Sequence, residues 1–286
     1  MFGFINVYKP VGMTSHDVVS YLRRVVKIKQ IGHTGTLDPF AKGVLPVAVG
    51  NATRLIEYLD DDKAYIGRFN FGKSTTTYDI EGDVVNTYNT KISVEDIIKN
   101  LPEGEIEQYP PIYSAKKVNG KKLYEYARNN EEVKITPHNV NIYKSELLNF
   151  NEEEQYADIY IKCSKGTYIR SIANDLGESL NNGCYLSKLK RVQAGMFKVD
   201  KSVPLDDLKT KEEVEKFLLN PVDFLSLPKQ ELNEVEYNRT IHGMNIYNRI
   251  NSAEGEIVLL LKNKDLVAIS VTAEVGLKPK KVFVSE

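Results

Sequence analysis

One short stretch of the sequence combines residue types that could do covalent chemistry. Residues 32–43 read GHTGTLDPFAKG, with three glycines, one proline and a single carboxylate, Asp38. Pro39 disfavours helical backbone at Asp38 and favours extended geometry there. The glycines allow another segment of the chain to approach closely. A carboxylate presented in this way can act as a nucleophile or as a general base.

The same stretch has a plainer interpretation, because Asp-Pro is common turn chemistry in which the aspartate bonds its own backbone. Judged by spacing alone, that turn is the favoured interpretation of Asp38. Phosphate-binding loops are excluded, since the chain has neither G-x-x-x-x-G-K-[ST] nor G-x-G-x-x-G. Its four histidines are scattered, and no H-x-x-x-H or C-x-x-C occurs. We therefore predict neither a metal nor a cofactor.

The composition of the chain limits the partners and the cellular location that can be expected. The formal net charge of −1 over 286 residues excludes bulk electrostatic capture of nucleic acid, although a local basic groove remains compatible with it. Two cysteines, Cys163 and Cys184, are too few for a disulfide framework, so we expect reduced thiols and a cytoplasmic location. No run approaches the ~20 apolar residues that span a bilayer, so no membrane association is expected.

The elements next to this stretch must hold it in place. Residues 4–8 (FINVY) predict a strand, and Thr14 and Asp17 form a capping box that opens a helix. Residues 44–50 (VLPVAVG) predict a buried strand, which Pro46 makes an edge strand or an irregular one. The stretch would thus lie between that helix and that strand.

Elements further along follow from periodicity. Residues 157–163 (ADIYIKC) alternate apolar and polar side chains, which is typical of a half-buried strand. Residues 164–180 predict a turn through Gly166 followed by a helix. Further helices are expected at 51–59 (with Asn51 near its cap), at 93–101 and at 206–219.

Strands and helices interleave without regular βαβ spacing, so the main domain is predicted to be mixed α+β. Residues 103–140, rich in Pro, Lys and Tyr, are expected to form an excursion from its compact core. Residues 220–230 resemble a linker, and the short strands beyond it suggest a small β-barrel.

Five segments, taken in order, carry more information than any single motif. They are NVYKPVGMTSHDVV, GHTGTLDPFAKGVLPVAVGNATRL, YDIEGDV, PPIYSAKKVNGKKLYEYAR and CSKGTYIRSIANDLGESL. Together they resemble the TruB family of tRNA pseudouridine synthases over residues 4 to about 197, and this resemblance reverses the preference for a plain turn at Asp38. It implies a pseudouridine synthase catalytic domain with a mixed sheet at 1–220, which contains an RNA-gripping insertion at 103–140. It also implies a PUA-like RNA-binding β-barrel at 229–286.

The resemblance implies that the protein isomerises uridine 55 in the T loop of tRNA. The N1–C1′ bond breaks, the base turns, and C5 joins C1′, without redox change and hence without a cofactor. The buried uridine must first be flipped out of its stack. Asp38 would be the nucleophile, attacking either the sugar C1′ or the base C6. The T-arm stem-loop would be the partner of a monomer that needs no obligate protein partner.

Other roles are implied position by position. Tyr65 would lie against the target base and help to move a proton, and Arg170 would pair with Asp38, orienting it and keeping it ionised. Without the motifs, Tyr65 would be interpreted as a core aromatic and Arg170 as a surface residue. The implied substrate-binding residues are His33, Tyr65, Tyr168 and Leu189.

Possible RNA contacts form a further set, comprising Lys9, Arg54, Asp79, Lys116, Lys117, Lys121 and Lys122. Two positions depart from the family pattern. Thr76 stands where an acid is usual, and Arg54 stands where a lysine is common, which keeps the charge but changes its geometry.

Two alternatives remain open. A non-catalytic RNA-binding or RNA-folding protein on the same scaffold would use the tyrosine–lysine insertion and the barrel alone. Modification of rRNA within a guide complex is known in relatives of the family, but the short C-terminal region argues against it.

Overall fold

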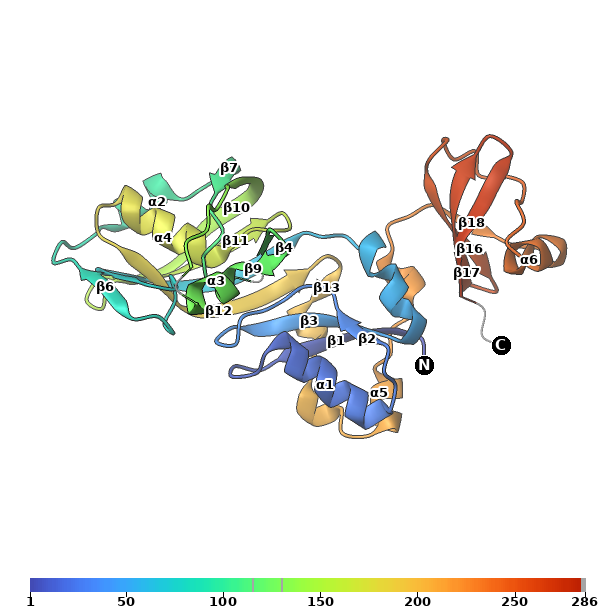
Figure 1. Ribbon diagram of the computed structural model, residues 1–286, viewed down its shortest axis with the longest axis horizontal. Helices are drawn as coiled ribbons and strands as arrows, with labels where there is room; N and C mark the ends of the chain where they lie inside the picture. The colour runs from blue at the N-terminus through green and yellow to red at the C-terminus, as the bar shows by residue number, and fades with distance from the viewer. Residues whose placement is uncertain (115, 130, 284–286) are drawn as a thin grey trace.

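A computed structural model describes residues 1–114, 116–129 and 131–283. Within these ranges the chain forms a ten-stranded sheet and a separate four-stranded sheet, which Figure 1 shows at the two ends of an elongated molecule. Helices pack against both sheets, which confirms the α+β class. No helix in these ranges is long and apolar enough to cross a membrane.

The large sheet contains β1 (Gly3–Lys9), β2 (Ile31–His33), β3 (Lys42–Val49), β4 (Lys63–Phe71), β7 (Gly104–Gln108), β10 (His138–Asn151), β11 (Tyr156–Cys163), β12 (Cys184–Ala194), β13 (Phe197–Lys198) and β14 (Val203–Pro204). Their order is β14-β1-β3-β12-β4-β11-β10-β7, with β2 beside β3 and β13 beside β12. The pairings are antiparallel except β1 with β14 and β3 with β12, which are parallel.

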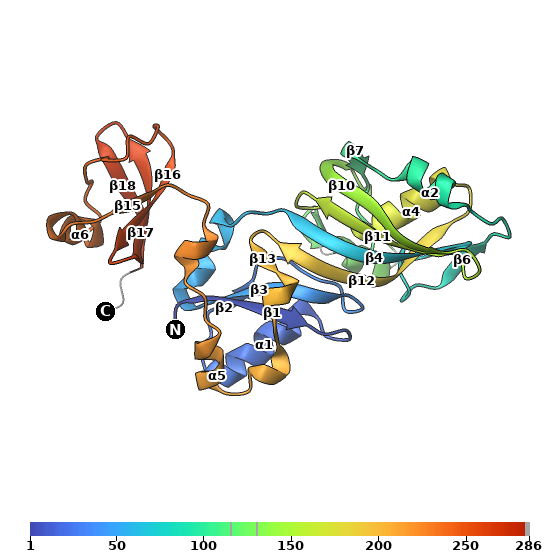
Figure 2. The same ribbon diagram turned by 180° about the vertical axis from the view of Figure 1, so that it is seen from behind.

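The helices are α1 (Ser15–Val26), α2 (Val94–Asn100), α3 (Leu123–Arg128), α4 (Ile169–Ser179), α5 (Lys211–Lys216) and α6 (Glu234–Ile241). Short 3-10 helices are η1 (Gly50–Tyr58), η2 (Val199–Lys201), η3 (Leu205–Asp207) and η4 (Pro221–Phe224). The capping box of Thr14 and Asp17 is present at α1, and Ser93 and Asp96 form another at α2. Apolar faces of α1 and α5 cover the β1–β3 half of the sheet, and α4 covers the β4–β11–β12 half (Figures 1 and 2).

Strand β3 corrects the expectation for Pro46, because it is neither an edge strand nor irregular. Pro46 pairs with Asn6 of β1 in continuous register. On its other side β3 pairs with β12 only at residues 42–43 and with β2 only at residues 47–49. Pro46 lies between these pairings, where its carbonyl accepts from the Thr34 N–H at 3.0 Å and its missing N–H leaves no ladder bond open.

Other boundaries also differ from expectation. Residues 51–58 of the expected helix 51–59 fall in the 3-10 helix η1, which has Val49 at its N-cap and no side-chain cap, so Asn51 does not cap it. The helix expected at 206–219 is only α5, preceded by η3. Residues 104–108 do not leave the core, because β7 pairs with β10 as the last strand of the sheet.

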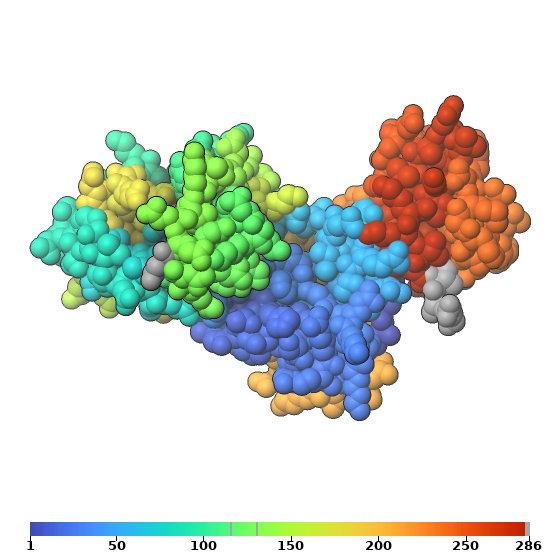
Figure 3. Space-filling model, viewed as in Figure 1, coloured from blue at the N-terminus to red at the C-terminus, as the bar shows by residue number. Residues whose placement is uncertain are grey.

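Two small ribbons complete the part of the molecule that contains the ten-stranded sheet. Strands β5 (Lys73–Thr75) and β6 (Val84–Thr87) form one, and β8 (Lys117–Val118) and β9 (Lys121–Lys122) form the other. The second ribbon leads into α3. In the space-filling view the green segment that contains α3 adjoins the blue N-terminal segment (Figure 3).

The four-stranded sheet contains β15 (Lys229–Glu231), β16 (Ile257–Lys262), β17 (Asp265–Ala273) and β18 (Gly276–Val282), in that order. Within the described ranges no pairing joins β18 to β15, so the sheet is not closed into the expected barrel. The three-residue β15 is too short to provide a full wall. The last part of the expected domain, residues 284–286, lies outside the described ranges.

The two sheets meet at a junction built on η1. The Arg54 guanidinium donates to the Val282 carbonyl at 3.1 Å and stacks 5.1 Å from the centre of the Phe283 ring. Lys281 donates to the Arg54 carbonyl at 2.9 Å and pairs with Glu57. Arg54, predicted as an RNA contact, thus makes its contacts with the C-terminal sheet.

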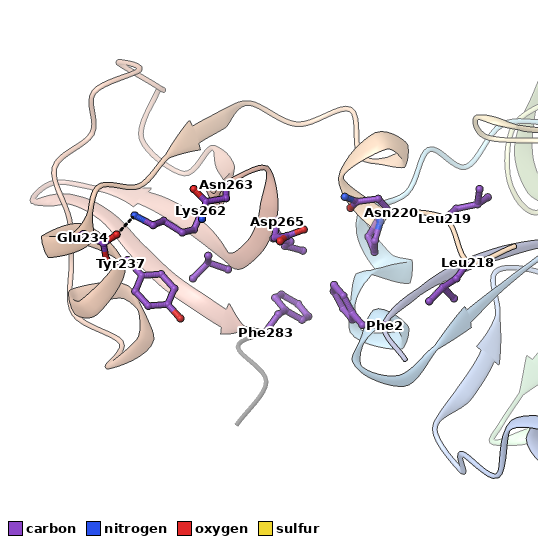
Figure 4. Close-up of a pocket in the computed structure, with 13 residues that line it drawn as sticks. Phe2, Leu218, Leu219, Asn220, Glu234, Tyr237, Lys262, Asn263, Asp265 and Phe283 are labelled. Carbon is purple, nitrogen blue, oxygen red and sulfur yellow. Dashed lines mark hydrogen bonds and ion pairs between the residues drawn. The ribbon is translucent and has the colours of Figure 1, made fainter. Parts of the chain in front are cut away.

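A cavity of about 700 Å³ lies beside this junction, and Phe2 and Phe283, whose ring centres are 5.6 Å apart, form part of its wall (Figure 4). Its polar contact is the Lys262–Glu234 ion pair at 2.7 Å. The residues that line it do not include Asp38, which lines a second cavity.

Candidate active site

The loop that carries Asp38 connects β2 to β3 and is fastened on both sides of the carboxylate. Ser15, at the start of α1, accepts the Leu37 N–H at 2.8 Å and donates to the Leu37 carbonyl at 3.2 Å. The Gly12 N–H donates to the Pro39 carbonyl at 2.8 Å, and the Ala41 N–H donates to the Asp38 carbonyl at 3.1 Å. Asp38 is therefore held by its backbone neighbours, as its place before proline predicts.

Two buried cations donate hydrogen bonds to backbone carbonyls of this loop and of the segment before α1. Lys9 donates to Met13 at 2.6 Å, to Pro10 at 2.9 Å and to Pro39 at 3.4 Å. Burial lowers the pKa of Lys9 to about 8, with Asp38 opposing the shift. Because its side chain is fully buried and bonded, the structure does not place Lys9 where an RNA contact would be made.

The second cation is Arg191, which is also fully buried. It donates to the carbonyls of Gly35 at 3.0 Å, Thr36 at 3.3 Å and Val44 at 2.7 Å, and so ties together the two ends of the loop. Sequence reasoning missed this residue. The available signal was its position two residues after Leu189 in a strand, which puts both side chains on one face.

Of the three loop glycines, the packing requires only Gly43. Its φ is +109°, and a Cβ there would lie 2.2 Å from the Arg191 carbonyl. Gly32 and Gly35 have ordinary room for a Cβ, with the nearest atoms at 3.8 and 3.4 Å. The close approach that the sequence predicted is therefore that of β3 to β12 at Gly43.

Arg170 joins two carboxylates from distant segments. Its Nε lies 3.0 Å from Asp38 Oδ2 and its Nη2 lies 3.3 Å from Asp38 Oδ1. Its Nη1 lies 3.2 Å from Asp79 Oδ2, and its Nη2 also donates to the Tyr113 carbonyl at 3.0 Å. The expected pairing of Arg170 with Asp38 is present. Asp79, expected near RNA, is buried and instead provides the second carboxylate of this network.

Burial dominates the electrostatics of Asp38, although its side chain keeps 32% exposure. The pKa of Asp38 is raised above its usual value by burial. Arg170 opposes this shift, and the negative charge of Asp79 adds to it. The sequence-based expectation that Arg170 keeps Asp38 ionised thus captures one contribution only. Burial likewise raises the pKa of the Tyr65 phenol, which keeps it protonated at neutral pH.

Asp38 lines a cavity of about 950 Å³, within the usual size range of ligand sites. Tyr65, Tyr168, Leu189 and Arg170 line the same cavity, so five predicted site residues come together from distant parts of the chain. Tyr168 is fixed by its backbone, which accepts from Gln108 at 3.0 Å and donates to it at 2.8 Å. The result is an acid beside apolar and aromatic walls.

His33 is not part of this lining and lies on β2, directly before the lining residue Thr34. Burial and the charge of Arg191 lower the pKa of His33, which favours the neutral imidazole. Its Nδ1 atom is buried and has no hydrogen-bond partner within the described ranges.

The four predicted lysines of the insertion separate into different environments. Lys116 lines the cavity, 3.4 Å from His138 Nδ1. Lys117 is exposed, Lys121 pairs with Glu131 at 2.6 Å, and Lys122 donates to the Tyr124 hydroxyl at 3.3 Å. Lys63, Arg128 and Lys165 also line the cavity and were missed, because an isolated cation in the sequence does not indicate a site.

The substitution of Thr76 for the usual acid leaves its loop closed. The Thr76 hydroxyl accepts the Asp83 N–H at 3.1 Å, and the Thr76 N–H donates to the Asp83 carbonyl at 3.0 Å.

Both cysteines are free and buried. No group of three His, Cys, Asp or Glu side chains in the described part of the chain is arranged to hold a metal ion.

Known proteins resemble this chain in sequence and in fold. A profile of the TruB family pseudouridylate synthases (N-terminal domain) matches residues 23–169. A tRNA pseudouridine synthase B from Caldanaerobacter subterraneus subsp. tengcongensis is 42% identical, covering 98% of this chain and 99% of that protein. A protein of the same description from Staphylococcus aureus (strain JH9) is 40% identical over the same shares.

Two solved structures have the same fold. A Cbf5-Nop10-Gar1 complex contains a chain that is 26% identical, with a TM-score of 0.74, covering 99% of this chain and 85% of that one. An H/ACA RNP bound to a substrate RNA containing 2′-deoxyuridine matches with 24% identity and a TM-score of 0.75, covering 99% and 86%, which shows the fold alone. The chain therefore belongs to the TruB family of pseudouridine synthases, which are isomerases.

Proposed function

We propose that this protein isomerises uridine 55 in the T loop of tRNA to pseudouridine, with Asp38 as the nucleophile. One observation carries the proposal: Asp38, paired with Arg170, faces a cavity shared with Tyr65, Tyr168 and Leu189. Membership of the TruB family supports the reaction. The tRNA substrate is supported by the descriptions of the 40–42% identical relatives.

In the proposed reaction the uridine leaves its stack and enters the cavity. Tyr168 and Leu189 provide surfaces for the base, and Tyr65 lies against it, placed to help move a proton. Arg170 holds the Asp38 carboxylate by two N–H groups, so the attacking oxygen needs no reorientation when the base arrives.

The bonds and protons balance without an external reagent. Asp38 attacks either C1′ or C6, the N1–C1′ bond breaks, and the base turns. The C5–C1′ bond then forms, C5 loses its hydrogen, N1 gains a proton and Asp38 is released. Asp38 must be ionised to attack, and the raised pKa of this carboxyl makes that requirement dependent on pH.

The larger assembly belongs to the same proposal. Residues 1–220 would form the catalytic domain, and the lysines of the insertion, with His33 beside the extruded nucleotides, would grip the T arm. The sheet within 229–286 would be an RNA-binding domain of PUA type. We propose that the protein acts as a monomer in the cytoplasm.

The test is tritium release from a T-arm-containing tRNA transcript labelled at uridine C5. Wild-type protein should release tritium, and Asp38→Ala should lose at least about 10⁴-fold in rate, as expected for removal of a nucleophile. The affinity of this variant for the transcript should change little. Mapping the modified base then tests position 55.

Two outcomes would contradict the proposal. Full activity of Asp38→Ala would exclude Asp38 as the nucleophile. Absence of release from folded wild-type protein that binds the transcript would favour an RNA-binding or RNA-folding protein on the same scaffold.

A further inference from the structure

A carboxylate stands between two lysines at the Asp38 cavity. Asp61 Oδ2 lies 3.1 Å from the Nζ of Lys165, which belongs to the turn between β11 and α4. Asp61 Oδ1 lies 3.9 Å from the Nζ of Lys63, the first residue of β4. All three residues line the cavity. The ion pair with Lys165 therefore joins segments that are 104 residues apart in the chain.

The lining of this cavity contains more cationic side chains than carboxylates, and Asp61 is one of the few carboxylates in it. In the described part of the chain its lining carries two carboxylates, Asp38 and Asp61, against five lysine and arginine side chains. Asp38 is already paired with Arg170. Asp61 is thus the carboxylate that offsets the remaining cations, at a cavity proposed to admit a polyanion.

The neighbouring acids of the DDDK run do not share this position. Asp60 accepts from the Ser226 hydroxyl at 2.8 Å, on the connection to the C-terminal sheet. The Asp62 backbone carbonyl accepts from the Gly195 N–H at 2.7 Å. Neither residue lines the cavity, which makes Asp62 a matched control for Asp61.

The ammonium group of Lys63 lies in an environment where a nearby negative charge would stabilise it. Its side chain is only 15% exposed, and its Nζ donates to the Asp61 carbonyl at 2.7 Å, which fixes the ammonium group. Burial and Arg191 lower the pKa of Lys63, whereas Asp61, and less strongly Cys163 and Asp62, counter them. A buried ammonium without a negative partner is unfavourable, so displacement of Asp61 would favour the entry of another anion.

We propose that Lys63 and Lys165 bind one phosphate of the RNA backbone beside the flipped uridine, and that Asp61 occupies this phosphate position in the free protein. This inference rests on the proposed function, whose substrate is RNA. A phosphodiester presents two non-bridging oxygens on one atom, as a carboxylate does, and lysine ammonium groups bind both. Exposed ion pairs are weak, so the phosphate can displace Asp61 at little cost.

The first experiment measures binding of a T-arm stem-loop to Asp61→Asn and to the control Asp62→Asn. Removal of the competing carboxylate should tighten binding about 1.5- to 5-fold, the range that corresponds to an exposed ion pair. Asp62→Asn should change the affinity less than Asp61→Asn does, because Asp62 lies outside the cavity and its influence on Lys63 is weaker. Unchanged or weaker binding by Asp61→Asn would overturn the inference.

The second experiment locates the phosphate. Single neutral methylphosphonates are placed at successive positions of the stem-loop, and each RNA is titrated with wild type, Lys63→Met and Lys165→Met. In wild type one position near the target uridine should cost about 10-fold or more in affinity, the effect of a lost charge-assisted bond. In both variants the penalty at that position should fall to less than about 2-fold.

Two controls keep the result interpretable. Lys144→Met removes an exposed lysine outside the cavity and should keep the wild-type pattern of penalties, and Lys63→Arg should keep the penalty because it keeps the charge. Lys165 is 75% exposed, so its replacement tests the site without disturbing the fold, whatever Lys63→Met does. Equal penalties in wild type and Lys165→Met would overturn the inference.

These binding measurements need no turnover. Suppose that wild type releases tritium, but the loss of affinity caused by each methylphosphonate is the same in wild type, Lys63→Met and Lys165→Met. The phosphate site is then wrong and the proposed function stands. If the methylphosphonate penalty disappears in the two lysine variants but wild type releases no tritium, the phosphate site stands and the isomerase proposal fails.

Discussion

At the scale of single residues, Asp38 is defined by what surrounds it. Arg170 lowers its pKa while burial and Asp79 raise it, and the net direction is upward. A carboxyl with a raised pKa becomes protonated at a higher pH than an ordinary one. The ionised form of Asp38, the proposed nucleophile, is therefore lost as the pH falls through that raised pKa, and kcat/KM should show an acid limb above the usual aspartate value of 3.8.

Asp79→Asn tests this balance. Removing the neighbouring negative charge should lower the pKa of Asp38 and move the acid limb of kcat/KM to lower pH. At neutral pH the rate should fall by about 10-fold or less, because Arg170 keeps its contacts with Asp38 but loses one anchor. The measurement is tritium release between pH 4 and 8, with the exposed Asp83→Asn as control. If the acid limb of kcat/KM moved to higher pH in Asp79→Asn, Asp79 would not be a group that raises the pKa of Asp38.

At the scale of elements, the position of the loop that carries Asp38 depends on α1 and β12 more than on its own sequence. Ser15 bonds both backbone groups of Leu37. Arg191 binds the carbonyls of Gly35 and Thr36 at one end of the loop and that of Val44 at the other. These contacts explain how an irregular loop can hold a carboxylate in one position. A loop whose buried carbonyls lacked such partners would be unstable.

Ser15→Ala should therefore affect stability and turnover together. The lost hydroxyl leaves a buried N–H unpaired, which should cost about 1–2 kcal/mol of unfolding free energy. Misplacement of Asp38 should lower kcat about 10-fold with little change in RNA affinity. Ser93→Ala is the matched control: it removes the cap of α2, should cost about 1 kcal/mol, and should leave kcat unchanged. Equal kcat values for the two variants would show that Ser15 only stabilises the fold.

At the scale of the whole molecule, the C-terminal sheet is attached through η1, which directly follows β3 of the catalytic sheet. Arg54 stacks on Phe283, and Lys281 reaches back to Arg54 and Glu57. Apolar side chains from both parts, including Phe4 and Ile269, share one buried cluster. The orientation of the proposed RNA-binding sheet is therefore determined by contacts with the catalytic part.

Arg54→Ala should loosen this attachment. The lost stacking and hydrogen bond should weaken docking by about 1–2 kcal/mol and speed protease cleavage at residues 225–229. Affinity for an isolated T-arm stem-loop should change less than about 2-fold. An unchanged rate of proteolysis, together with RNA affinity weakened more than about 10-fold, would contradict this role. It would show instead that Arg54 contacts RNA, as predicted from the sequence.

The sequence alone indicated a good part of this arrangement. Strict alternation predicted β11, and a capping box placed the start of α1, because both signals act within a few residues. The ordered motifs identified the family and singled out Asp38, Tyr65, Tyr168, Arg170 and Leu189, which the fold brings to one cavity. Pro46 misled because strand pairing around it overrides local propensity. Asn51 misled because η1 already begins at Gly50, with Val49 at its N-cap.

What only the tertiary structure decided is which charges meet. Lys9, Asp79 and Arg191 are charged residues of types that usually lie on the surface, yet all three are buried. Lys9 and Arg191 bond the loop that carries Asp38, and Asp79 pairs with Arg170. Asp61 meets Lys165 across 104 residues of sequence. The sequence by itself determined local backbone geometry and the family, since those depend on neighbouring residues and motif order. The electrostatics of the site depend on long-range contacts and on burial, which arise only when the sheet has formed.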